Sequence, residues 1–394
     1  MNNKLCQGFK VSGIKSGIKK NGEHDLGLIY SEVPATVAGV FTRNAVAAAP
    51  VILDRKRVQK GTARAIIVNS GNANCCTGDD GMEKAEKMTA IAAGALNIDA
   101  EDVLVASTGV IGQPLPIEKI EQHAAELAGA LNENGLADFS KAILTTDLVK
   151  KEVTRTGEID GKTFTITGVA KGSGMIRPDM ATMLCFVMTD VDIKAPVLKN
   201  TLVHAADHSF NRITVDGDTS TNDTILVMAN KASGIVLDQP EKVALFQACL
   251  TDVLIDLAKM VVRDGEGATK LVEVKVVHAP SVQAATQVAQ TIANSNLVKT
   301  ALFGEDANWG RIIAAAGRSG IPIDPDKIDI GFNDIMMVKN GVGCGQDVED
   351  QVARILKQPE FEILVDLNMG EGASSVFTCD FSYDYVKINA DYRS

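Results

Sequence analysis

The residues with the clearest chemical potential are an alanine and a threonine at the end of a loop. Ala181 and Thr182 follow the Gly- and Pro-containing stretch 171–178 and come just before an apolar run at 183–191. A threonine that attacks its own preceding carbonyl is released with a free α-amine, whose unperturbed pKa is ~7.7–8. That amine can act as the base for the hydroxyl of the same residue. The spacing alone leaves a second interpretation open, because most threonines between a loop and a strand are caps or strand formers.

Other polar groupings suggest weaker chemistry. His204 and His208 stand four apart on a predicted helix but lack the adjacent glutamate of zinc-protease patterns, so we expect surface or capping histidines and no metal. The stretch 216–223 lacks the glutamate that closes a calcium loop, which favours a polar turn near a site. The stretch 265–270 departs from phosphate-loop spacing, but its two glycines allow close backbone approach around Glu266.

The elements that must position these residues predict an α/β or α+β fold. Strand-like apolar runs alternate with stretches whose hydrophobic residues recur at the helical period. Strands are expected at 63–68, 103–106, 183–191 and 270–277, helices at 82–96, 117–131, 241–262 and from 281, and a hairpin over 152–167 with its turn at Asp160-Gly161. The run at 183–191 is expected to be a central strand, because it shows no polar alternation until Thr189. A boundary near 275–282 separates a main domain, residues 1–278, from a smaller one, residues 279–394.

Length and composition exclude several classes of protein. Of the 394 residues, 45% are hydrophobic and 23% are charged, as in globular domains. The net charge of −11 argues against a nucleic-acid partner and against contact with anionic membranes. No apolar run approaches the ~20 residues of a membrane span, and residues 1–6 form no signal core, so the expected location is the cytoplasm. The seven cysteines form no Cys-x-x-Cys pair, which argues against a disulfide framework or a zinc ribbon.

A series of motifs runs in order along nearly the whole chain. It comprises residues 41–51 (FTRNAVAAAPV), 69–74 (NSGNAN), 107–112 (STGVIG), 145–147 (TTD), 170–176 (AKGSGMI), 180–184 (MATML), 209–224 (SFNRITVDGDTSTNDT), 306–311 (DANWGR) and 388–394 (INADYRS). Together they closely resemble the ornithine acetyltransferase family, the glutamate N-acetyltransferases of arginine biosynthesis. Asp179 and Cys75 stand where that family commonly has Asn and Ala, and neither departure removes a functional group.

The resemblance implies a precursor that cleaves itself between Ala181 and Thr182. Residues 1–181 and 182–394 then stay associated as α and β chains, in an α2β2 heterotetramer. The implied fold is a layered α/β/β/α-type sandwich with a smaller C-terminal α/β domain. In the implied ping-pong cycle, N2-acetyl-L-ornithine acetylates Thr182 and ornithine leaves. L-Glutamate then accepts the acetyl group and departs as N-acetylglutamate.

The resemblance also implies the roles of the other site residues. Thr108 and Gly109 match the positions that stabilise the oxyanion, and Lys171 is the expected cation for the substrate carboxylate. Glu266 is expected to accept the ornithine ammonium. The family's remaining binding positions fall on Thr145, Thr146, Asn389 and Ser394. Of the threonine pair we favour Thr145, and the other two residues imply that the C-terminal tail returns to the active site.

The expectation is therefore an enzyme without a bound cofactor or metal. Acetyl-CoA stays open as a co-substrate, because bifunctional members of the family also make N-acetylglutamate from it and no residue here decides. Two alternatives stay open as well. A related N-terminal-nucleophile amidohydrolase or aminopeptidase would release the acyl group to water. An uncleaved amino-acid-binding protein would bind its ligand without turnover.

Overall fold

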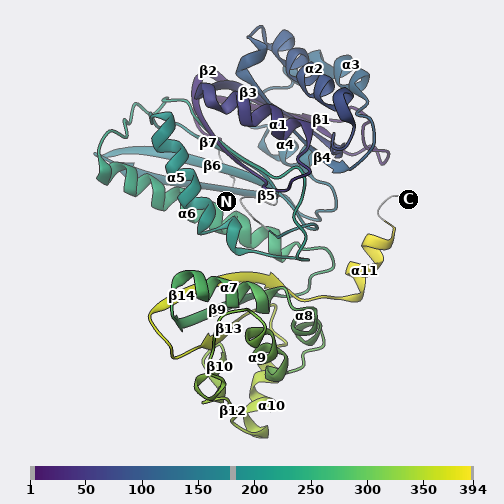
Figure 1. Ribbon diagram of the computed structural model, residues 1–394. Coiled ribbons are helices and arrows are strands. Elements are labelled where there is room, and N and C mark those ends of the chain that lie inside the picture. The colour runs from purple at the N-terminus through teal and green to yellow at the C-terminus, as the bar shows by residue number, and fades with distance from the viewer. Residues whose placement is uncertain (1–4, 178–182, 392–394) are drawn as a thin grey trace. The chain divides into compact units, whose positions relative to one another are not determined.

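The structure is a computed structural model that describes residues 5–177 and 183–391. The chain forms two compact units. Unit 1 consists of Met1–Gly172, Pro178–Asn211 and Thr219–Val261, and unit 2 of Ser173–Arg177, Arg212–Asp218 and Val262–Ser394. Each unit is built around a β-sheet of its own (Figure 1). The boundary expected between residues 278 and 279 stays a prediction.

Unit 1 contains an eight-stranded mixed sheet. Its strands are β1 (Phe9–Ile14), β2 (Leu26–Phe41), β3 (Thr62–Asn72), β4 (Val103–Val110), β5 (Lys151–Ile159), β6 (Lys162–Lys171), β7 (Leu184–Thr189) and β8 (Thr224–Ala229). The order is β4-β3-β2-β8-β7-β6-β5, with β1 paired to β2. The predicted central strand is confirmed, since β7 lies parallel to β8 and antiparallel to β6.

The long strand β2 divides this sheet into two layers. Its first half pairs with β1 and β3, its second half pairs with β8, and the register breaks between Tyr30 and Ala35. One core cluster joins apolar side chains of β1, β3 and β4 with those of β6, β7 and β8, so the two halves face each other. Helix α4 (Leu136–Ile143) adds to that cluster, where Phe139 meets Phe186 edge to face at 5.8 Å between ring centroids.

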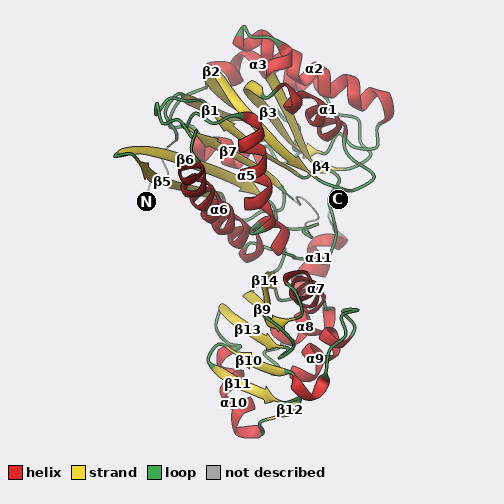
Figure 2. Ribbon diagram, turned by 60° about the vertical axis from the view of Figure 1, so that its left-hand side comes forward, coloured by secondary structure: helices red, strands yellow, loops and turns green. Residues whose placement is uncertain are grey.

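Helices cover the outer faces of both layers, which completes the expected α/β/β/α sandwich (Figure 2). Helices α1 (Ala49–Arg57), α2 (Gly78–Leu96) and α3 (Ile117–Gly129) pack on the β1–β4 layer around a second cluster. Helices α5 (Ala195–Asp207) and α6 (Pro240–Arg263) lie on the other layer. Gly168 of β6 lets α6 approach closely, because a Cβ there would lie 2.7 Å from Leu257.

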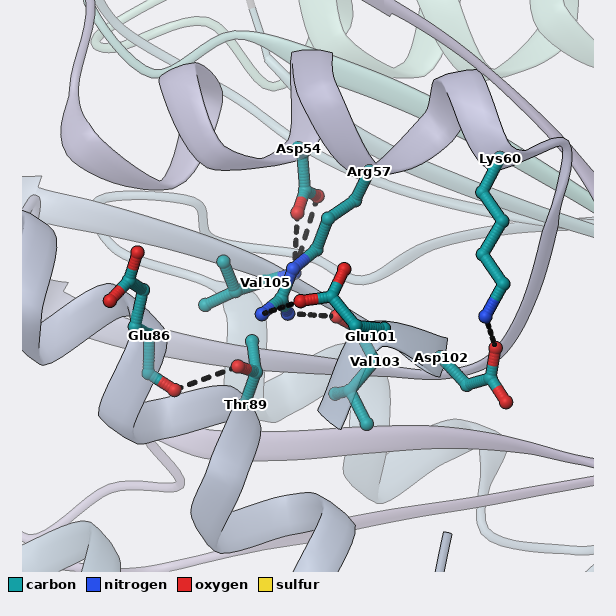
Figure 3. A network of polar contacts seen from close by, with 9 residues as sticks. All are labelled: Asp54, Arg57, Lys60, Glu86, Thr89, Glu101, Asp102, Val103 and Val105. Carbon is teal, nitrogen blue, oxygen red and sulfur yellow. Dashed lines mark hydrogen bonds and ion pairs between the residues drawn. The ribbon is translucent and has the colours of Figure 1, made fainter. Parts of the chain in front are cut away.

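Polar side chains of α1 hold strand β4, which carries the Thr108-Gly109 motif (Figure 3). The buried Asp54 carboxyl accepts the Val105 amide at 3.0 and 3.2 Å, and Arg57 donates to the Val103 carbonyl at 2.5 Å. Burial raises the pKa of Asp54 well above its ordinary value, although the Val105 amide and the Arg57 charge oppose that rise. The base of β4 is therefore fixed to α1 by buried hydrogen bonds.

Unit 2 contains a six-stranded sheet in the order β12-β11-β10-β13-β9-β14. The strands are β9 (Leu271–Ala279), β10 (Asp329–Phe332), β11 (Ile335–Lys339), β12 (Val342–Gly343), β13 (Glu360–Asp366) and β14 (Gly372–Cys379). The helices are α7 (Val282–Ala293), α8 (Asn296–Phe303), α9 (Trp309–Gly317), α10 (Gln346–Ile355) and α11 (Tyr383–Ala390). A cluster of Val, Ile and Ala side chains fills the space between the sheet and helices α7 to α10.

The other predicted elements are also present. The hairpin of β5 and β6 turns at Asp160 and Gly161, whose φ angles of 54° and 73° suit a type I′ turn. Short 3-10 helices occupy Val58–Lys60, Ala100–Asp102, Phe210–Arg212 and Pro325–Lys327. Over residues 5–177 and 183–391, no helix has both the length and the apolar character needed to cross a membrane.

Candidate functional site

At the end of β4, the backbone of Gly109 lies unusually close to the backbone of the neighbouring strand β3. Gly109 has a φ of 130°, and a Cβ there would lie 2.6 Å from the Asn72 nitrogen and 2.7 Å from the Gly71 Cα of strand β3. Both the backbone conformation and the space therefore require glycine. Thr108, directly before it, is 8% exposed. The Thr108-Gly109 pair thus sits in a fixed backbone geometry.

Asparagine side chains hold the chain around this pair. Asn222 donates to the carbonyls of Ala73 and Ser107 at 2.6 and 2.8 Å. The Ser107 hydroxyl donates to the Asn69 side chain at 2.6 Å. All of these groups are buried, so the segment has little freedom to move. Hydrogen-bond donors on such a fixed segment stabilise a developing oxyanion better than donors on a mobile one, because they need no reorganisation.

Lys171 stands at the end of β6, beside the start of the strand that follows Thr182. It is opposite Leu184 of β7, and Leu184 is in turn opposite Thr224 of β8. The Lys171 ammonium donates to the Thr108 hydroxyl oxygen at 3.3 Å in a buried setting. Ala181 and Thr182 lie outside the described residues. The structure therefore brings Lys171 and Thr108 together and places the first residues after Thr182 beside them.

A buried carboxylate, Asp147, joins Lys171 to the threonine motif. Its Oδ1 accepts the Gly172 amide and the Lys151 ammonium, each at 2.7 Å, and its Oδ2 accepts the Thr145 amide at 3.1 Å. Burial alone would raise its pKa. The charges of Lys171 and Lys151 and the hydrogen bonds outweigh that effect and lower the pKa of Asp147 to about 2. Asp147 is therefore an anion at neutral pH.

A second carboxyl near Lys171 behaves differently. Asp223 precedes β8 and is buried, and burial raises the pKa of its carboxyl well above the ordinary value. Hydrogen bonding by Ser220 and the Lys171 charge only partly oppose that rise. Among the described residues, its Oδ2 has no hydrogen-bond partner. The surroundings of Lys171 thus shift the pKa values of two carboxyls in opposite directions, a separation typical of sites that handle protons.

Unit 2 brings together two other predicted residues, Glu266 and Asn389. Glu266 follows α6 in a turn, and its amide donates to the Ser173 carbonyl at 2.9 Å. The Asn389 side chain, on α11, donates to Glu266 Oε2 at 2.7 Å. A Cβ on Gly174 would lie 2.5 Å from both carboxylate oxygens. The Glu266 carboxylate therefore rests directly on the backbone of Gly174.

Helix α11 is anchored by its side chains. Tyr385 donates to Asp216 at 3.2 Å, and Ser382 donates to the Gly267 carbonyl at 2.6 Å. Asp216 also accepts the amides of Met175 and Ile176 at 2.6 and 2.8 Å. Burial raises the pKa of the Asp216 carboxyl despite these amide bonds. The C-terminal helix is thus tied to the segment that holds Glu266, while Ser394 lies outside the described residues.

Sequence reasoning missed three buried groups: Asp147, Asn222 and Asp223. Asp147 belongs to the Thr-Thr-Asp motif, and the other two belong to the polar stretch 209–224, so the signal was present as polar residues beside strand ends. Asp147 binds Gly172 and Asn222 binds Ala73 and Ser107, all distant in sequence, and the burial of Asp223 depends on the tertiary fold, which is why the motifs did not reveal their roles. The catalytic and binding roles expected for the site residues stay predictions.

Comparisons with known proteins identify the family. The model of the ArgJ family matches residues 10–394. The arginine biosynthesis bifunctional protein ArgJ of Geobacter sulfurreducens is 50% identical over 390 residues, 98% of this chain and 99% of that protein. The ArgJ protein of Syntrophotalea carbinolica is also 50% identical, with the same coverage. A crystal structure of arginine biosynthesis bifunctional protein argJ from Bacillus halodurans shares 45% identity and a TM-score of 0.50, over 52% of this chain and 97% of that one. The chain belongs to the ArgJ family of arginine biosynthesis.

Proposed function

We propose that this chain is a self-cleaving threonine acetyltransferase that moves the acetyl group of N2-acetyl-L-ornithine to L-glutamate. The observation that carries the proposal is the buried contact of Lys171 with Thr108, 3.3 Å long, beside the start of the strand that follows Thr182. Acyl transfer needs a nucleophile, a fixed oxyanion site and a cation for the substrate carboxylate. Thr108, Gly109 and Lys171 of unit 1 suit two of these tasks, and Thr182, the proposed nucleophile, comes two residues before β7 in the sequence.

Cleavage would generate the nucleophile. The Thr182 hydroxyl attacks the Ala181 carbonyl, the peptide bond becomes an ester, and water hydrolyses that ester. Ala181 then ends the α chain with a carboxylate, and Thr182 begins the β chain with a free amine. The amine is the base that takes up the hydroxyl proton during acyl transfer.

Transfer then proceeds in two steps. The Thr182 hydroxyl attacks the acetyl carbonyl of the donor, and the Thr108 hydroxyl and Gly109 amide stabilise the tetrahedral oxyanion. The carbon–nitrogen bond breaks, and ornithine leaves with the proton that the Thr182 amine had received. The glutamate amine next attacks the acetyl ester, and the Thr182 oxygen regains a proton as N-acetylglutamate leaves.

Binding groups follow from the charges of the substrates. Lys171 would pair with the α-carboxylate that donor and acceptor share, and Thr145 would help to bind the same substrates. Glu266, fixed by Asn389, would take the side-chain ammonium of ornithine. Acetyl-CoA serves as an additional donor if the chain is bifunctional, and no bound cofactor or metal takes part. The α and β chains would assemble as an α2β2 heterotetramer.

An acetyl-transfer assay with two variants tests the proposal. Purified wild-type protein is given N2-acetyl-L-ornithine with and without L-glutamate, and N-acetylglutamate and ornithine are quantified. We expect N-acetylglutamate only when both substrates are present, and none from Thr182→Ala. Ornithine release without glutamate at the rate of transfer would instead support the amidohydrolase. Transfer by Thr182→Ala would remove Thr182 as the acyl carrier.

A further inference from the structure

Asp147 is enclosed by cationic and amide donors from three parts of unit 1. It follows α4, its partner Lys151 begins β5, and its partner Gly172 follows β6. The Asp147 and Lys151 side chains are both 0% exposed. The Asp147 charge also acts on Lys171, the residue directly before Gly172. One carboxylate therefore fixes the backbone beside Lys171 and attracts the Lys171 ammonium.

The contact between Lys171 and Thr108 has a defined direction. An ammonium group has three donors and no acceptor, so the Thr108 hydroxyl must be the acceptor in their 3.3 Å hydrogen bond. The hydrogen of the Thr108 hydroxyl cannot then point toward Lys171. It is left to donate elsewhere, and the positive charge on the oxygen side makes it a stronger donor.

We propose that Asp147 is a positioning residue for acetyl transfer: it fixes Lys171, and through Lys171 it orients the Thr108 hydroxyl toward the oxyanion. The proposal rests on the proposed function, in which Thr108 stabilises the tetrahedral intermediate. Because the oxyanion exists only on the way to and from that intermediate, the Asp147-Lys171-Thr108 relay lowers the barrier rather than strengthening substrate binding. Its loss should therefore reduce kcat by a larger factor than it raises KM.

A purely structural role for Asp147 predicts a different result. Asp147 also neutralises the buried Lys151, and removal of one partner of a buried ion pair is strongly destabilising. Asp147→Asn alone therefore combines two effects. The double variant Asp147→Asn/Lys151→Met separates the two effects. It removes the Lys151 ammonium that the loss of Asp147 would leave buried, while Lys171 still lacks the negative charge of Asp147. Restored folding with low kcat supports the relay, whereas restored folding with wild-type kcat overturns it.

Kinetics of cleaved, folded protein provide the readout. We expect Asp147→Asn/Lys151→Met to lose about 10–100-fold in kcat, less than the ~10²–10³-fold loss of an entire oxyanion donor. The KM values for both substrates should rise by a smaller factor than kcat falls, because Lys171 keeps its charge and still pairs with the substrate carboxylate. Asp190→Asn is the matched control, since it removes another buried carboxyl of unit 1 that accepts a backbone amide, that of Thr165. It should keep the wild-type kcat, and a loss equal to that of the double variant would overturn the proposal.

A mutant cycle with Thr108→Ala makes the test specific to the relay. The triple variant combines Asp147→Asn, Lys151→Met and Thr108→Ala. If Asp147 acts through Thr108, its kcat should equal that of Thr108→Ala within about twofold. If the kcat loss of the triple variant instead equals the product of the losses of the double variant and of Thr108→Ala, Asp147 acts by another route and the proposal is overturned. Wild-type protein assayed in parallel separates this outcome from failure of the proposed function, because absence of wild-type transfer would contradict that function itself.

Discussion

Gly174 offers a way to move one charged group of the candidate site by a known amount. A Cβ at this position would lie 2.5 Å from both oxygens of Glu266, whereas ordinary contacts begin at 3.4 Å. Gly174→Ala therefore requires the carboxylate to move by about 1 Å, the size of displacement that can cost ~10²-fold in rate. The φ angle of Gly174 is not in the left-handed region, so the backbone itself accepts alanine.

The assay compares two acetyl donors on the same protein. Under the proposed function, Glu266 binds the side-chain ammonium of N2-acetyl-L-ornithine, an interaction that N-acetyl-L-norvaline lacks because its side chain ends in a methyl group. We expect Gly174→Ala to lower the kcat/KM ratio of the first donor to the second by about 10²-fold, equivalent to ~2.7 kcal/mol. Since both donors meet the same enzyme molecules, incomplete folding or cleavage cancels from the ratio.

Gly317→Ala is the matched control for this experiment. Gly317 also belongs to unit 2, at the end of α9, and no atom lies within 4 Å of a Cβ added there. Its donor ratio should equal that of the wild type. If Gly174→Ala kept the wild-type ratio of kcat/KM values, the inference that Glu266, positioned against Gly174, binds the ornithine ammonium would be refuted.

Three further variants test other parts of the site and the fold. Gly109→Ala should abolish measurable transfer, because a Cβ there would lie 2.6 Å from the Asn72 nitrogen; turnover within tenfold of wild type would contradict the fixed geometry at β4. Asn389→Ala removes the 2.7 Å hydrogen bond to Glu266 and should raise KM for N2-acetyl-L-ornithine more than for glutamate, as measured by initial rates. Asp54 has a raised pKa in the folded state, so its stabilising contribution is present at low pH and is lost as pH rises through that pKa. Asp54→Asn, which resembles the neutral acid, should thus raise Tm at neutral pH, with the gain vanishing toward about pH 4; a gain independent of pH would contradict this assignment.

Local patterns in the sequence predicted the elements of this fold well. The apolar run at 183–191 became the central strand β7, and Asp160-Gly161 became a turn with positive φ at both residues. These features depend on periodicity and turn chemistry within a few residues. The division of β2 between two layers was not predictable in this way, because it depends on pairing with β3 and β8, which are distant in sequence.

The same distinction applies to the candidate site. Motifs pointed to Thr108, Lys171, Glu266 and Asn389, and the structure brings the first two and the last two into hydrogen-bond contact. The part played by Asp147 was not visible, because its partner Gly172 lies 25 residues away along the chain. Gly174 likewise looked like an ordinary loop glycine, and only the position of the Glu266 carboxylate explains why it has no side chain.

The central claim, that Thr182 becomes a free N-terminal residue and carries the acetyl group, is tested most directly by intact-mass spectrometry of the denatured protein. We expect two chains, residues 1–181 and 182–394. After incubation with N2-acetyl-L-ornithine alone, the second chain should be one acetyl group heavier, with the group on the Thr182 hydroxyl, and L-glutamate should remove it. A single uncleaved chain, or an acetyl group on another residue, would show that Thr182 is not the acyl carrier.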